Sequence, residues 1–384
     1  MADQQTPIVV KFGGSSFIEL PAYRRVARHL SELAHDEGRP VVAVVSGMSG
    51  STGRLLEAAR DVDPDLEPHV QDQVLATAEI VSVGLLRAAL HAEGVRATDL
   101  WAPHIGMRRI ASGPVIAVDR RRLLDALVGK TVAVVAGGQA LDSDGRIVMF
   151  GRNSSDLTAV AVAAAVGADQ CQIYSDVDGV YTADPHVVPG ARLMPELSYA
   201  QCAAMSSSGA KVLHAGAVRL AEVHGIDIVC ASLTPDGAVT GSVIGAGRGL
   251  AAVVGDRRTQ VFRFVGASAD DALERARACG VVGVTVVQGD ETIHCFAGQQ
   301  GDVAAALRRA GIDALAVSGL GLLSVVQPDG QTEHTAVGVD SLDGAVRDLH
   351  VHLHGDSAAT TRWPAPKRRS NHSGLLLSAR RAEG

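Results

Sequence analysis

Short runs of β-branched residues, each ending in a turn rich in glycine or serine, constrain the fold of the N-terminal region. Such runs occupy residues 8–12, 41–45 and 132–136, with shorter ones at 172–174 and 227–231. Stretches with the apolar spacing of helices lie among them, over about 22–37, 70–93, 156–167 and 199–224. Continuous apolar strands that alternate with helices are typical of a mainly parallel sheet covered on both faces. The sequence therefore predicts an α/β/α sandwich over residues 1–248.

The pattern changes after residue 248. The sequence predicts strands at 260–265, 281–287 and 292–296, helices at 268–279 and 302–310, and one or two further strands within 312–326. This β-α-β-β-α-β order is ferredoxin-like. We call residues 249–355 the C-terminal module, in which 331–355 could complete a second unit of this kind only in part. Residues 356–384 are basic and irregular, which predicts a disordered, solvated tail.

Charge and composition exclude several classes of function. A formal net charge of −7 argues against nucleic acid as the main partner, because binding phosphates requires a basic surface. The five cysteines include no CxxC pair, so neither a zinc ribbon nor a disulfide framework is indicated. The N-terminus lacks the pattern of a signal peptide, and the apolar stretch at 157–168 is too short to cross a bilayer. We expect a cytoplasmic protein with no membrane partner.

The first glycine-rich turn is the first candidate for a chemical role. Lys11 precedes Gly13 and Gly14 directly at the end of a strand, where ligands of parallel sheets bind. Glycine lets backbone N–H groups approach phosphate oxygens, and a lysine adds a cation. The order of residues is not that of a Walker loop. Further cations and backbone donors follow later strands, as phosphoryl transfer requires: the 46–52 loop, Gly137, Gly138, Gly151, Arg152 and Lys211.

Read in order, these segments resemble the aspartokinase family, a branch of the amino acid kinases. The matching segments are VVKFGGSS (9–16), VVAVVSGMSGSTGRLL (41–56), TAE (77–79), VAVVAGGQALDSDGRI (132–147), GRNSSDLTA (151–159), YSDVDGVYTADPHVVPGAR (174–192) and SSGAKVLHAGAVRLAEVHGIDI (207–228). The resemblance implies an amino-acid-kinase α/β/α sandwich followed by an ACT-type module. It also implies an enzyme of amino-acid biosynthesis that phosphorylates the side-chain carboxylate of aspartate or a related amino acid.

The resemblance also implies roles for individual residues. Lys11 and Asp156 would be catalytic, with Asp156 organising Lys11 against the γ-phosphate of ATP. Gly13, Gly14, Ser175, Asp176, Tyr181, Asp184 and Lys211 would bind the nucleotide. Ser46, Thr52, Glu79 and Arg152 would bind the substrate, the arginine through a bidentate fork to its α-carboxylate. Mg²⁺ would be held largely by phosphate oxygens and water, without a dedicated protein metal site.

Some positions depart from the family pattern and leave alternatives open. Asn153 and Ser154 stand where the family has glycines, and His186 stands in place of an arginine. A catalytically weak paralogue that binds nucleotide or amino acid and regulates a partner is therefore the alternative to an active kinase. Phosphorylation of a hydroxyl or carbamate is a third. We expect the C-terminal module mainly to build a homodimer, with weak or no inhibition by lysine or threonine.

Three features have plainer interpretations. His350, His352 and His354 alternate and could chelate a metal from one face of a strand, although a structural role at the end of the module is favoured. The serines at 206–208 are interpreted as the start of a helix rather than as a nucleophile. Glu79 could be a solvated helix residue, Ser46 and Thr52 turn formers, and Tyr181 a packing residue.

Overall fold

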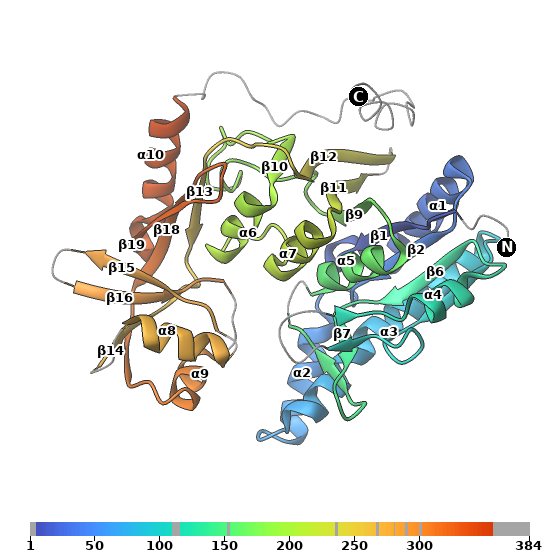
Figure 1. Ribbon diagram of the computed structural model, residues 1–384, viewed down its shortest axis with the longest axis horizontal. Coiled ribbons are helices and arrows are strands. Elements are labelled where there is room, and N and C mark those ends of the chain that lie inside the picture. The colour runs from blue at the N-terminus through green and yellow to red at the C-terminus, as the bar shows by residue number, and fades with distance from the viewer. Residues whose placement is uncertain are drawn as a thin grey trace.

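The computed structural model describes residues 5–109, 116–151, 154–234, 237–265, 269–279, 281–288, 291–298 and 302–355. Figure 1 shows a large layered α/β region formed by the N-terminal part of the chain, with the smaller C-terminal module beside it. The predicted tail at 356–384 lies outside the described residues.

One eight-stranded sheet forms the centre of the N-terminal region. Its strands follow the order β10-β12-β11-β9-β1-β2-β6-β3, and every neighbouring pair is parallel except β11 and β12. The predicted mainly parallel sheet is thus confirmed. The strands are β1 (Ile8–Phe12), β2 (Val41–Val45), β3 (Ala97–Leu100), β6 (Val132–Ala136), β9 (Gln170–Ser175), β10 (Glu196–Ser198), β11 (Asp227–Thr234) and β12 (Gly237–Gly245).

Helices cover both faces of this sheet, because its central strands are apolar on both sides. In β1, Ile8 and Val10 belong to the core cluster on one face, and Val9 belongs to the cluster on the other. Residues of α1 and α3 fill the first cluster, and residues of α4, α5, α6 and α7 fill the second. The helices are α1 (Leu20–Glu37), α2 (Ser51–Val62), α3 (Pro68–Ala92), α4 (Arg120–Leu127), α5 (Ser155–Val166), α6 (Tyr199–Ser207) and α7 (Ala215–His224).

Several short elements were not predicted. The helix α2 begins inside the segment interpreted as a loop, and α4 is a charged, two-turn helix. A small sheet of order β5-β4-β7-β8 extends beyond β6 and is built from β4 (Arg108–Arg109), β5 (Ile116–Ala117), β7 (Gln139–Leu141) and β8 (Ile147–Met149). Strands of two or three residues carry too little alternation to be recognised from sequence.

The predicted helix over 199–224 is wrong in one respect, because the chain breaks it into α6 and α7. Gly209 lies in the break with φ of 101°, a conformation that interrupts a helix and favours glycine. The serines at 206–208 therefore end a helix, with Ser208 at the C-cap of α6, and do not start one.

The C-terminal module contains the predicted ferredoxin-like unit. Its four strands form an antiparallel sheet of order β15-β16-β14-β17, and α8 and α9 cover one face. This confirms the β-α-β-β-α-β order and resolves the 312–326 segment into two strands, of which the second joins another sheet. The elements are β14 (Gln260–Phe264), α8 (Ala269–Ala278), β15 (Val284–Gln288), β16 (Glu291–Phe296), α9 (Val303–Arg309) and β17 (Ala314–Val317).

A three-stranded antiparallel sheet joins the module to the N-terminal region. It consists of β13 (Ala252–Asp256), β18 (Leu320–Val326) and β19 (Thr332–Gly338), and α10 (Leu342–His354) packs on it. The alternating histidines lie in α10, so a metal site on one strand face is wrong. Buried His350 instead hydrogen-bonds Thr182, and His354 bonds the carbonyl of Ala251. Among the described residues, no group of three His, Cys, Asp or Glu side chains could hold a metal ion.

The helix α3 is long and apolar enough to cross a membrane by length and composition alone. Core helices of globular proteins meet the same criteria, and here Val83, Leu86 and Leu90 are buried against the sheet. We therefore interpret α3 as a core helix.

Candidate active site

The turn after β1 brings the predicted lysine and glycines together. Lys11 is almost fully buried, and its Nζ lies 2.8 Å from Oδ1 of Asp156. A Cβ on Gly13 would lie 3.1 Å from that Nζ, and one on Gly14 would lie 3.1 Å from the carbonyl oxygen of Gly47. Side chains would thus crowd the turn, whereas glycine leaves its backbone open beside the buried cation.

Asp156 lies in the first turn of α5 and connects three parts of the fold. Its Oδ1 faces Lys11 of β1, and its Oδ2 accepts a hydrogen bond of 3.1 Å from the backbone N–H of His214, the residue before α7. Burying two charges is costly unless they are paired, so the contact fixes the ammonium group in place. His214 was not predicted. Burial lowers the pKa of its imidazole, and the negative charge of Asp156 opposes that shift.

A second group of polar residues follows β2. Ser46 Oγ donates to Ser155 Oγ at 2.9 Å, and Ser155 immediately precedes Asp156 in α5. The backbone N–H of Gly47 donates to Glu79 Oε1 at 3.2 Å. Ser46 and Glu79 were predicted, whereas Gly47 and Ser155 were not. Ser155 could have been identified from the motif GRNSSD, but a backbone donor such as Gly47 leaves no signal in the sequence.

Glu79 is the carboxylate with the most strongly altered pKa among the predicted site residues. Burial raises its pKa from an ordinary 4.5 to about 7, and the hydrogen bond from Gly47 partly opposes this rise. Its Oε2 is buried and has no hydrogen-bond partner among the described residues. A buried acceptor without a partner is costly, so this oxygen is suited to receive a ligand donor such as an ammonium group.

Of the residues predicted for the nucleotide, Ser175 lies at the same edge of the sheet. Ser175 ends β9, the neighbour of β1, and the preceding carbonyl of Tyr174 accepts a hydrogen bond from Gly13 N–H. Ser175 Oγ and Tyr181 Oη both bond within the segment, to the Val177 carbonyl and to Asp178 Oδ1 respectively. The side chains of Asp176 and Asp184 are exposed.

Two predicted residues, Lys211 and Thr52, are not joined to this group among the described residues. Lys211 is exposed in the segment between α6 and α7, and Thr52 is half-buried in the first turn of α2. Within the described part of the chain, no hydrogen bond or ion pair connects either side chain to Lys11, Ser46 or Glu79. Arg152 lies outside the described residues, as does Asn153.

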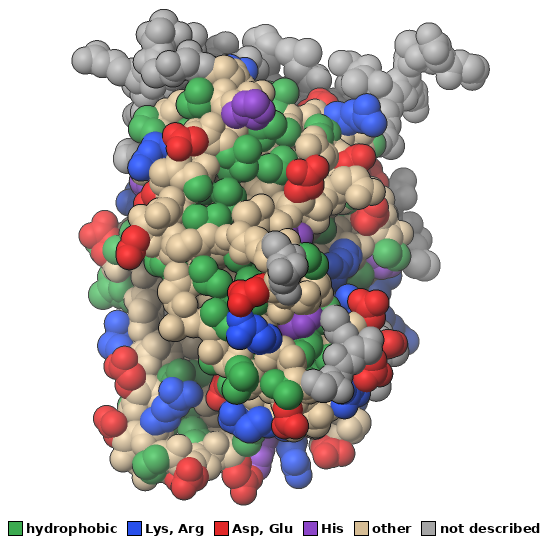
Figure 2. Space-filling model, turned by 90° about the vertical axis from the view of Figure 1, so that its left-hand side faces the viewer, with side chains coloured by type: hydrophobic (Ala, Val, Ile, Leu, Met, Phe, Trp, Pro, Cys, Tyr) green, Lys and Arg blue, Asp and Glu red, His purple; other side chains and the backbone are tan. Residues whose placement is uncertain are grey.

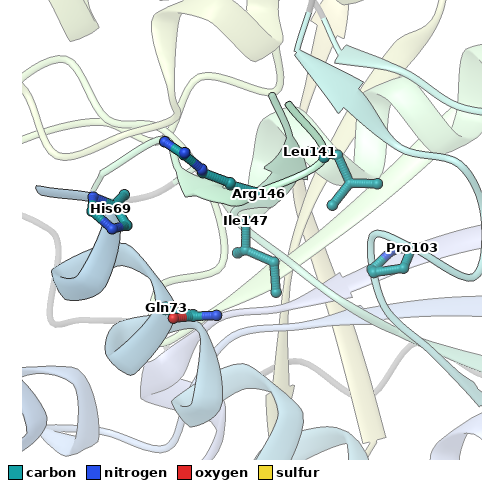
Figure 3. Close-up of a pocket in the computed structure, with 7 residues that line it drawn as sticks. His69, Gln73, Pro103, Leu141, Arg146 and Ile147 are labelled. Atoms are coloured by element: carbon teal, nitrogen blue, oxygen red, sulfur yellow. The ribbon is translucent and has the colours of Figure 1, made fainter. Parts of the chain in front are cut away.

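A separate cavity of about 400 Å³ lies beside the β7–β8 hairpin. Figure 3 shows His69 and Gln73 from α3 on one side and Pro103 on the other, with Leu141, Arg146 and Ile147 of the hairpin between them. No predicted site residue lines this cavity. It was missed because segments far apart in the sequence form it.

Comparison with known proteins places the N-terminal region in a defined family. The model of the "Amino acid kinase family" matches residues 6–232. An aspartokinase from Thermus thermophilus is 37% identical over 222 residues, which cover 57% of this chain and 55% of that protein. An aspartokinase from Mycolicibacterium smegmatis is 39% identical over 227 residues, covering 58% and 53%. The chain thus matches only about half the length of these curated relatives.

Solved structures extend the likeness of the fold into the C-terminal module. The Escherichia coli aspartokinase III complex with aspartate and ADP matches with a TM-score of 0.70 at 18% identity, covering 90% of this chain and 99% of that one. The aspartate kinase from Synechocystis matches with a TM-score of 0.56 at 24% identity, covering 94% and 71%. At such identities the likeness concerns the fold.

Proposed function

This chain belongs to the amino acid kinase family, and on that premise we propose that it transfers the γ-phosphoryl group of ATP to the side-chain carboxylate of aspartate or a related amino acid. The observation that carries the proposal is the buried contact between Lys11 and Asp156 beside the open Gly13-Gly14 turn. The aspartokinases among its relatives, and the aspartate and ADP in one matching structure, support the choice of substrate and nucleotide.

Phosphoryl transfer to a carboxylate needs positioning and charge neutralisation more than proton transfer. The acceptor carboxylate has no proton to lose, so no general base is required. One of its oxygens forms a bond to the γ-phosphorus while the bond to the bridging oxygen of ADP breaks, and ADP leaves with the electron pair. Lys11 stabilises the negative charge on the transferring group, and Asp156 acts by holding Lys11 in place.

The nucleotide lies along the glycine turn and the segment after β9. Gly13 and Gly14 offer backbone N–H groups to the phosphates, and Lys211 adds a second cation. Ser175, Asp176, Tyr181 and Asp184 complete this side of the site. Mg²⁺ would neutralise phosphate charge and would be held largely by phosphate oxygens and water, with the exposed carboxylates of Asp176 and Asp184 as the protein groups that could take part.

The amino-acid substrate lies on the β2 side of the same edge. Ser46 and Thr52 hold the reacting carboxylate, and Arg152 takes the α-carboxylate. Glu79 binds the α-ammonium group through its unpartnered Oε2. Because burial alone raises the pKa of this carboxyl, a bound ammonium would return Glu79 to its charged form and gain an ion pair. This preference favours an amino acid over a dicarboxylic acid without the amine.

The intact ion pair favours an active enzyme over a nucleotide-binding regulator. A chain that only bound nucleotide would have no need for a buried lysine held at 2.8 Å by a buried aspartate. His186 does not disturb this pair, since its backbone N–H bonds to Asp184 at the exposed end of the nucleotide segment.

We further propose that the protein works in the cytoplasm as a homodimer formed through the C-terminal module. Figure 2 shows hydrophobic side chains gathered in the upper middle of the face that carries the module, with charged side chains around them and over the lower half. Exposed Val287, Leu315 and Val351 belong to the module. Exposed apolar side chains of this kind favour association.

An ADP-release assay over amino acids and dicarboxylates tests the proposed function. Wild-type protein should release ADP with aspartate or a close analogue that keeps the α-amine and the α-carboxylate, and Lys11→Met should not. ADP release that needs no amino acid, or that Lys11→Met leaves intact, would contradict the proposal.

A further inference from the structure

The segment that carries Lys211 is held by residues of the C-terminal side of the chain. Figure 1 shows α6, which leads into this segment, between the large sheet and the module. At the start of α6, Ser198 Oγ donates to the carbonyl of Pro328 in the β18–β19 turn, and Gly330 lies so close that its Cβ would be 2.9 Å from the backbone of Ala200. Gln201 Nε2 also donates to the carbonyl of Leu250.

The other end of α6 is held by one arginine. Arg258, in the link between β13 and β14, donates from Nη2 to the carbonyl oxygen of Gly209 at 3.1 Å. Its Nε donates to Oδ1 of Asp256 at 3.1 Å, so the guanidinium bridges a carboxylate and the loop backbone. Gly209 presses directly on Asp256, because a Cβ there would lie 2.5 Å from the aspartate side chain.

Asp256 holds the guanidinium in a fixed orientation. Its carboxylate is almost fully buried and also accepts hydrogen bonds from the backbone N–H of Arg258, from Thr259 Oγ1 and from the backbone N–H of Gly298. A carboxylate with this many donors does not rotate freely. With its Nε held by Asp256, the planar guanidinium directs Nη2 to the carbonyl oxygen of Gly209.

Lys211 thus lies between two fixed points of the backbone. Two residues before it, the Gly209 carbonyl is bound by Arg258; three residues after it, the backbone N–H of His214 is bound by Asp156. The carboxylate of Asp156 also holds Lys11. The segment consequently joins the C-terminal side of the chain to the proposed phosphate site.

We propose that Arg258 is a positioning residue for nucleotide binding, which acts by holding the Gly209 carbonyl so that Lys211 meets the phosphates. The inference rests on the proposed function, because Lys211 is the nucleotide cation there. Arg258 itself does not touch the nucleotide. Its effect on affinity must therefore pass through Lys211 and disappear when the lysine is removed.

The neighbouring arginine provides a matched control. Arg257 pairs with Asp343 of α10 and is more exposed than Arg258, and it makes no hydrogen bond to Gly209 among the described residues. Arg257→Met and Arg258→Met remove the same charge and the same donors from adjacent positions. Only the second change releases the Gly209 carbonyl.

Calorimetric titration with ADP and Mg²⁺ tests the inference on the full chain. Arg258→Met should bind ADP about tenfold more weakly than wild type, because the charge-assisted hydrogen bond between Lys211 and a phosphate is lost when the lysine is misplaced. Arg257→Met should bind ADP within about twofold of wild type. Arg258→Lys should be intermediate, because an ammonium group cannot bridge Asp256 and Gly209 as a guanidinium does. Lys211→Met should weaken binding as well, and adding Arg258→Met to it should have little further effect.

Two results would overturn the inference while leaving the proposed function intact. One is Arg258→Met binding ADP as tightly as wild type; the other is an equal loss for Arg258→Met with and without Lys211, which would indicate a merely structural role. Thermal denaturation of each variant separates a fall in folded fraction from a fall in affinity. A wild-type protein that binds no nucleotide would instead contradict the proposed function itself.

Discussion

The buried pair of Lys11 and Asp156 predicts that stability and activity respond differently to the same substitutions. Lys11→Met keeps the length of the side chain and removes its charge, leaving Asp156 buried with only the N–H of His214 as a partner. Orphaning a buried charge in this way should lower the free energy of unfolding by about 3–5 kcal/mol. In Lys11→Met/Asp156→Asn the second charge is gone, so most of that loss should be recovered.

Activity should not recover together with stability. Both variants lack the cation that neutralises the transferring phosphoryl group, and each should lose on the order of a hundredfold or more in kcat. Urea denaturation followed by circular dichroism measures the first effect, and steady-state ADP release measures the second. The reasoning is refuted if Lys11→Met is as stable as wild type, if the double variant is no more stable than the single one, or if activity returns with stability.

Three further predictions concern other parts of the molecule. Because the pKa of Glu79 is raised from 4.5 to about 7, the folded state binds one more proton than the unfolded state between these pH values. Without substrate, the unfolding free energy should therefore fall as pH rises from about 4.5 to 7. Glu79→Gln should remove this component from the pH profile of stability. In kinetics, the KM for the amino acid should rise as pH falls below about 7, and a wild-type profile that is flat there would exclude Glu79 as the ammonium ligand. Gly209→Ala should lower stability by more than Gly94→Ala, since both have positive φ but only the Cβ at 209 would collide with Asp256, and equal denaturation midpoints would count against that contact. Truncation after Gly247 should give a monomer of lower stability, whereas light scattering should show the full chain as a dimer. Lysine and threonine should inhibit the full chain weakly or not at all. Strong inhibition at micromolar concentrations would show that the C-terminal module binds a regulatory amino acid.

The sandwich could be predicted because its central strands are apolar on both faces. Apart from Lys11, the runs at 8–12, 41–45 and 132–136 contain only apolar residues, and they match β1, β2 and β6. The arginines of β4 have no such pattern, because that strand is only two residues long. At the break after α6, Gly209 has a positive φ and packs against Asp256, a contact that only the folded chain creates.

The site was predictable to the extent that side chains define it. Lys11 lies at the end of β1 and Ser46 follows β2, so residue type and position pointed to them. Glu79, within α3, and Asp156, in the first turn of α5, were predicted from the resemblance to the aspartokinase family. The N–H groups of Gly47 and His214 complete their hydrogen bonds, but any residue except proline has such a group. Arg258 could not be predicted for a related reason, since its partner is a carbonyl oxygen.

The central claim is that a carboxylate receives the phosphoryl group, and trapping the product with hydroxylamine tests it most directly. An acyl phosphate reacts with hydroxylamine to give a hydroxamate, whereas a phosphate ester does not. With ATP, Mg²⁺ and aspartate or the best acid found, wild-type protein should give hydroxamate in step with ADP, and Lys11→Met should give neither. ADP formed without hydroxamate, from a substrate that carries a hydroxyl group, would contradict the account.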